Sequence, residues 1–70
     1  MNTQSKRPTS YFVRRDRDGR ESWTGPLRSE RQADREAQAW RDAGWYATVE
    51  PATPEIKAEV RAWEKTKRAA

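Results

Sequence analysis

The fold is decided by residues 11–26, which read YFVRRDRDGRESWTGP. The first three of these residues are aromatic or β-branched and predict a strand, and Ser22 to Thr24 predict a second strand. Asp18-Gly19 lies between them as a turn signal, and Gly25-Pro26 is expected to end the second strand. The stretch therefore predicts a β-hairpin.

Charge suggests the register of this hairpin. A two-residue loop at Asp18-Gly19 would place Arg17 opposite Arg20 and Asp16 opposite Glu21, and both like-charged pairs are unfavourable. A three-residue loop, Arg17-Asp18-Gly19, pairs Asp16 with Arg20 and Arg15 with Glu21 instead. We therefore predict the three-residue loop. It sets Tyr11, Val13 and Trp23 on one face, and Phe12, Arg14, Ser22 and Thr24 on the other.

A helix is expected from Ser29, a good N-cap residue with Gln32 three residues later, to about Ala43, where Gly44 stops it. Its apolar face carries Ala33, Ala37, Trp40 and Ala43. The next residues, Trp45 to Val49, alternate in character and predict a third strand that Pro51 ends.

A second helix is expected to begin at Thr53-Pro54, because Thr is an N-cap residue and Pro suits the first helical position. Ile56, Val60 and Trp63 recur at helical spacing and form its apolar stripe. The predicted fold is α+β, a three-stranded antiparallel sheet with two helices in the order β-β-α-β-α. We expect the first helix on the Tyr11/Val13/Trp23/Val49 face. The second helix either covers the other face or lies beside the first.

The chain has 70 residues, of which Val, Leu, Ile and Phe together number six and Trp four, so its expected core is small and built from tryptophan. We expect residues 1–10 to form a disordered basic arm, residues 11–66 a single small domain and residues 67–70 a frayed end. No apolar run is long enough to span a membrane or serve as a secretory signal, so a cytoplasmic location is expected. Monomer and homodimer both remain open.

Enzymatic function is not expected. The chain has no His and no Cys, the usual general base near neutral pH and the usual strong nucleophile. Its three glycines have no phosphate-loop spacing, and its acids are dispersed. We therefore expect no catalytic residue, no metal site and no cofactor.

The distribution of charge points to nucleic acid. The chain has 15 Lys+Arg against 11 Asp+Glu, and the basic excess lies in residues 1–28 and 51–70, whereas residues 29–50 are mildly acidic. A basic surface on a small protein is typical of nucleic-acid binding. The candidate residues are Arg14, Arg15, Arg17 and Arg20 of the hairpin, and Lys57, Arg61 and Lys65 on a ridge of the last helix that continues to Arg68. The alternative is that both groups are ordinary solvated surface.

Phe12 and Tyr46, on the sheet face with Arg14 and Thr48, could stack bases if that face is open, and are core if the second helix covers it. The leading hypothesis is a small non-enzymatic accessory protein that binds nucleic acid through a basic hairpin. The alternative is a protein-interaction module, such as a phage-encoded modulator of a host protein, anchored by exposed Trp, Tyr and Arg.

The order of features from Tyr11 to Gly44, with its Arg- and Ala-rich composition, resembles small uncharacterised proteins of actinobacteria and their phages. It is also similar to the amino-terminal arm-binding domain of tyrosine integrases, a three-stranded sheet packed on a helix that binds DNA. Asp18-Gly19 and Ser29-x-x-x-Ala33 would match the turn and the start of the helix in that domain. In the integrase family all three strands precede the helix, whereas here the third is expected after it. We therefore transfer no binding residue from the resemblance.

Overall fold

The structure, a computed structural model, describes residues 10–69 of the chain and the side chains of residues 10–67. The arm expected over residues 1–10 lies outside this range except for Ser10. The helix expected to fray from Lys67 is described as helical to Ala69, and Ala70 lies outside the described residues.

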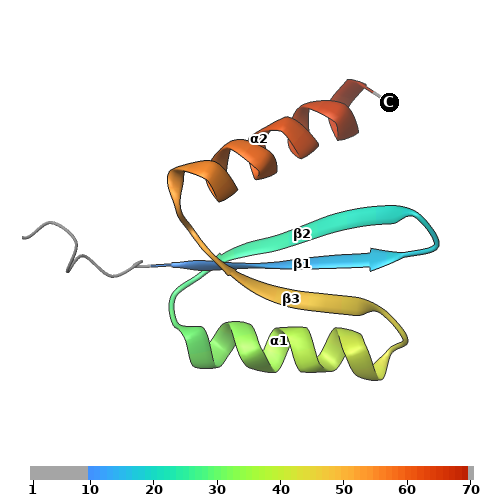
Figure 1. Cartoon of the computed structure of the whole chain (residues 1–70), viewed down its shortest axis with the longest axis vertical. Helices are drawn as coiled ribbons and strands as arrows, with labels where there is room; N and C mark the ends of the chain where they lie inside the picture. The colour runs from blue at the N-terminus through green and yellow to red at the C-terminus, as the bar shows by residue number, and fades with distance from the viewer. Residues whose placement is uncertain (1–9, 70) are drawn as a thin grey trace, which may run out of the picture.

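The elements follow the predicted order β-β-α-β-α, and the α+β class is confirmed. The sheet is antiparallel with the strand order β2-β1-β3, so β1 is central. Helix α1 lies on one side of the sheet and α2 on the other (Figure 1), which settles the open position of the second helix. The elements are β1 (Tyr11–Arg17), β2 (Arg20–Leu27), α1 (Glu30–Asp42), β3 (Tyr46–Pro51) and α2 (Pro54–Ala69).

The core under α1 is built from small residues. Ala33 and Ala37 of the helix are completely buried against Val13 of β1 and Ala47 of β3. Because alanine has no side chain beyond Cβ, the helix axis comes close to the strands. Partly buried larger residues surround this centre: Tyr11, Leu27, Trp40 and Val49.

The core under α2 is built from large residues. Phe12 and Trp23 are buried and meet edge to face, with ring centroids 6.2 Å apart and an interplanar angle of 87°. Val60 of α2 is buried against them, and Ile56 and Trp63 flank it as the apolar stripe predicted. Trp23 was expected under the first helix, and that expectation is wrong.

The displacement of Trp23 follows from the hairpin register. The loop has two residues, and Arg17 lies opposite Arg20 and Asp16 opposite Glu21, so the three-residue loop is wrong. Asp18 and Gly19 both have positive φ, 52° and 81°, as the two-residue turn of a hairpin requires. This turn places Arg14, not Val13, opposite Trp23. A shift of one residue moves a side chain to the other face.

Strand β2 also continues past its predicted end. It passes through Gly25 and Pro26 to Leu27, and its pairing with β1 shifts between Tyr11 and Val13. Proline is tolerated there because β2 is an edge strand. Gly25 has a φ of +134°, and a Cβ at this position would lie 2.9 Å from a ring carbon of Phe12 and 2.9 Å from the Tyr11 carbonyl oxygen. A glycine is therefore needed where β2 crosses the Phe12 ring.

The ends of the helices agree with prediction. The Ser29 hydroxyl accepts a hydrogen bond from the Gln32 N–H at 3.1 Å, and the Thr53 hydroxyl accepts one from the Ile56 N–H at 3.2 Å. At the end of α1, the N–H of Gly44 donates to the Arg41 carbonyl and the N–H of Trp45 to the Trp40 carbonyl. These two bonds form a Schellman motif, which fixes the direction in which the chain enters β3.

Candidate nucleic-acid interface

The hairpin arginines do not form one cluster, because neighbouring residues of a strand face opposite sides. Arg14 shares the α2 side of the sheet with Phe12, and Arg15 and Arg17 share the α1 side with Val13. The four candidate arginines must therefore be considered separately.

Arg14 is paired with an acid. Its Nε lies 2.7 Å from a carboxylate oxygen of Glu21, and both side chains are partly exposed. This diagonal ion pair offsets the like-charged pairing of Asp16 with Glu21 that disfavoured the observed register. Arg14 is consequently a weaker candidate for a phosphate contact than its position in the sequence indicates.

Arg15 has a structural role. It is half-buried, its guanidinium carbon lies 3.9 Å from the centroid of the Trp40 ring, and its Nη1 donates to the Thr24 hydroxyl. Burial lowers the pKa of Arg15, and the nearby Glu36 carboxylate raises it in part. An arginine nevertheless stays protonated, so the half-buried cation lies against the aromatic face of Trp40.

Arg17 and Arg20 form the exposed part of the hairpin tip. They are direct strand partners, and with Asp18 and Trp45 they line a hollow of about 450 Å³. Arg17 lies 5.9 Å from the Trp45 ring centroid, and its Nη1 lies 3.5 Å from the Ala43 carbonyl oxygen at the end of α1. Within residues 10–67, neither guanidinium forms an ion pair with a carboxylate.

Trp45 is the residue of this site that the sequence analysis missed. It meets Trp40 edge to face at a centroid distance of 5.5 Å, a contact that often accompanies a Schellman motif. The signal was present in the sequence, because Gly44 in the terminating position places residues 40 and 45 side by side. Cations and aromatic rings thus alternate in one series, which runs from Arg17 through Trp45 and Arg15 to Trp40.

The proposed base-stacking pair is separated. Phe12 is buried beneath α2, with 7% of its surface exposed, whereas Tyr46 on β3 is 69% exposed. Tyr46 lies opposite Asp16, and the next residue on its face, Thr48, hydrogen-bonds the Glu50 carboxylate at 3.0 Å. These acids disfavour a phosphate chain beside Tyr46.

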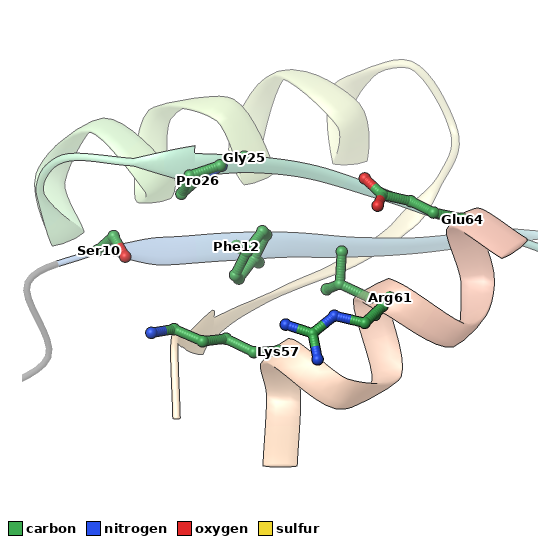
Figure 2. A pocket seen from close by; sticks show the side chains of 8 residues that line it. Ser10, Phe12, Gly25, Pro26, Lys57, Arg61 and Glu64 are labelled. Carbon is green, nitrogen blue, oxygen red and sulfur yellow. The ribbon is translucent and has the colours of Figure 1, made fainter. Parts of the chain in front are cut away.

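The basic ridge of α2 borders a second hollow, of about 350 Å³, between α2 and the beginning of β1 and end of β2. Lys57, Arg61 and Glu64 line it together with Phe12 (Figure 2). Lys65 is exposed and does not line it, and the side chain of Arg68 lies outside the described part.

No group of three or more potential metal ligands occurs among the described residues, and no described helix is long and apolar enough to cross a membrane. Comparison with known protein families, with curated proteins and with solved structures finds no match. The functional argument therefore depends on the geometry of the two basic sites.

Proposed function

We propose that this protein is a small, non-enzymatic, cytoplasmic accessory protein that binds nucleic acid through the tip of its β1–β2 hairpin. Arg17 and Arg20 would contact phosphates. The observation that supports this proposal is their direct opposition beside Trp45, with no ion pair to a carboxylate within residues 10–67.

Electrostatics explains why Arg17 and Arg20 are suited to bind phosphate. Like charges directly opposite each other on a sheet are destabilising, and a bound anion between them removes that cost. Guanidinium groups match phosphate oxygens with two parallel hydrogen bonds, which a flexible ammonium does not. A two-stranded ribbon also has the width to enter the major groove of duplex DNA.

The tip is partly pre-organised for such contacts. The ring of Trp45 and the terminal carbonyl of α1 hold Arg17, so less side-chain entropy is lost when it binds. Trp45 is itself held by Trp40 and by its backbone bond to the Trp40 carbonyl.

The test is fluorescence anisotropy with a labelled DNA duplex, a single-stranded DNA and an RNA of the same sequence, measured between about 50 and 200 mM salt. Arg17→Ala/Arg20→Ala is expected to weaken binding and to reduce the salt slope by about 2. Lys57→Ala/Arg61→Ala removes the same charge elsewhere and serves as the matched control. Equal loss in both variants would show that binding reflects net charge alone, and absence of binding at low salt would refute the proposal.

The alternative of a protein-interaction module is favoured by one observation: Tyr46 is exposed on β3, opposite Asp16 of β1 and on the same face as Glu50. Tyrosine is common at interaction hot spots, and the acids would select a basic partner surface. A protein captured by the wild type and lost with Tyr46→Ala, but retained with Arg17→Ala/Arg20→Ala, would support this alternative over nucleic-acid binding.

A further inference from the structure

The hollow between α2 and the sheet has a chemistry different from that of the hairpin tip. Three elements contribute to it: Phe12 comes from β1, Pro26 from β2, and Val60 with the charged residues from α2. Phe12 and Val60 form an apolar floor, and Pro26 is an exposed apolar wall. The tip, by contrast, offers only one ring among charged groups.

The cations of this hollow stand one helical turn apart. Lys57 and Arg61 both extend from α2 in the region below Phe12 in the view of Figure 2, and both are exposed. Neither forms an ion pair within the described side chains. Lys57 also lies in the first turns of α2, where the helix dipole adds positive potential. This side of the hollow is therefore suited to an anion.

The charge of the anion is limited by Glu64, which also lines this hollow. Two cations and one carboxylate leave a net charge of +1, which a monoanion neutralises. The volume of about 350 Å³ is at the small end of ligand pockets. Such a hollow has room for a small molecule with one charged group.

We propose that this hollow binds a small apolar monocarboxylate. The carboxylate lies between Lys57 and Arg61, and the apolar body rests on Phe12, Val60 and Pro26. The site is independent of the hairpin tip, so it can stand if nucleic-acid binding at the tip is disproved, and the reverse also holds.

A nucleic acid is a poorer occupant. Phe12 has only 7% of its surface exposed, which leaves too little ring face for a base to stack on it. Glu64 would repel the second and third phosphates of a strand that followed the ridge. An apolar body with a single carboxylate uses the floor and the cations together and avoids this repulsion.

The experiment is a titration of the full chain with 3-phenylpropanoate, followed by amide chemical shifts in two-dimensional NMR. We expect saturable shifts at Gly25 and Val60, with a dissociation constant in the millimolar range for a ligand of about ten heavy atoms. 3-Phenylpropanamide lacks the charge and acetate lacks the apolar body, so neither is expected to saturate these signals. Lys57→Ala/Arg61→Ala should weaken binding at least tenfold, and Lys65→Ala, which removes one charge from α2 outside the hollow, should leave it unchanged.

Other outcomes overturn the proposal. Equal saturation by the amide would show an apolar contact without charge recognition, and equal saturation by acetate would show charge alone. If a peptide with a free apolar C-terminus saturates the Gly25 and Val60 signals and 3-phenylpropanoate does not, the hollow is a protein contact. If only an oligonucleotide shifts them, the α2 ridge belongs to a nucleic-acid surface.

Discussion

The guanidinium carbon of Arg15 lies 3.9 Å from the centroid of the Trp40 ring. This contact joins the central strand β1 to α1, and the hydrogen bond from Arg15 to Thr24 extends it to β2. An arginine that looks like a surface residue in the sequence is thus part of the framework on which the exposed tip is built. Arg15, which has this structural role, and Arg17, for which we propose a phosphate contact, are two residues apart.

Arg15→Ala is expected to lower the free energy of unfolding by about 1–2 kcal/mol, because a half-buried cation–π contact and a charged hydrogen bond are both lost. Urea denaturation measures the change. Arg35→Ala removes the same charge from an exposed position on α1 and should stay within about 0.5 kcal/mol of wild type. Equal effects of the two substitutions would assign the loss to net charge.

The stability difference between wild type and Arg15→Ala should not change with pH between about 5 and 9. Burial lowers the pKa of Arg15, so the penalty on its charged form is present below the folded-state pKa and is relieved only as the pH rises through it. An arginine stays protonated throughout this pH range, so the penalty is constant. Denaturation midpoints across the range provide the measurement, and a trend in the difference would contradict the assignment of Arg15 as permanently charged.

Arg20→Glu is expected to raise the free energy of unfolding by about 0.5 kcal/mol, because it converts the opposition of Arg17 and Arg20 into an attractive pair. The same substitution should weaken nucleic-acid binding at the tip. Arg20→Gln, which removes repulsion without adding attraction, should give a smaller gain. The gain in stability should shrink in 1 M salt, where the screening length is about 3 Å; a gain that persists there would have another origin.

Gly25→Ala is expected to cost about 2–3 kcal/mol, because the added Cβ would meet the Phe12 ring and the Tyr11 carbonyl at a positive φ. Gly44→Ala also has a positive φ, of 96°, but nothing lies within 4 Å of its added Cβ, and it should cost only about 1 kcal/mol. Thermal unfolding of the two variants provides the comparison. Equal losses would mean that backbone strain alone, and not the approach to Phe12, determines the cost.

Trp23→Ala should leave most of the chain unfolded at 25 °C. The substitution removes about 3–5 kcal/mol of packing, which is comparable to the whole stability expected of a domain this small. Tyr46→Ala, at the exposed aromatic on β3, should change stability by less than about 0.5 kcal/mol. Circular dichroism during thermal unfolding measures both, and a cooperative transition near that of wild type for Trp23→Ala would show that the core under α2 contributes little.

The order of elements, the caps at Ser29 and Thr53 and the stripe on α2 could all be predicted, because each follows from a local pattern. The hairpin register could not be predicted from charge. Repulsion between exposed side chains is worth only tenths of a kcal/mol to about 1 kcal/mol, and the turn geometry of Asp18-Gly19 together with the burial of Trp23 outweighs it. The ion pair of Arg14 with Glu21 then reduces the repulsion further.

The error in register also explains what was missed at the candidate sites. With Trp23 assigned to the α1 face, the sequence offered no reason to place Phe12 and Trp23 together under α2 or to find a hollow beside them. The proximity of Trp45 to Arg17 depends instead on the pairing of β1 with β3, in which Asp16 lies opposite Tyr46, and on the Schellman motif at Gly44. The positions of Trp23 and Trp45 are therefore decided by the pairing of strands in the tertiary structure rather than by local propensity.

The two helices pack on the sheet through side chains of different size. Helix α1 sits on alanines close to the strands, whereas α2 rests on aromatic rings, and Val60 alone is buried among its described side chains. The amide protons of α2 should therefore exchange with solvent earlier than those of α1, through an opening that leaves the rest of the sheet intact. Each such opening exposes Phe12 and Trp23 together. The partly open state that forms most readily is therefore also the state most prone to associate with other apolar surfaces.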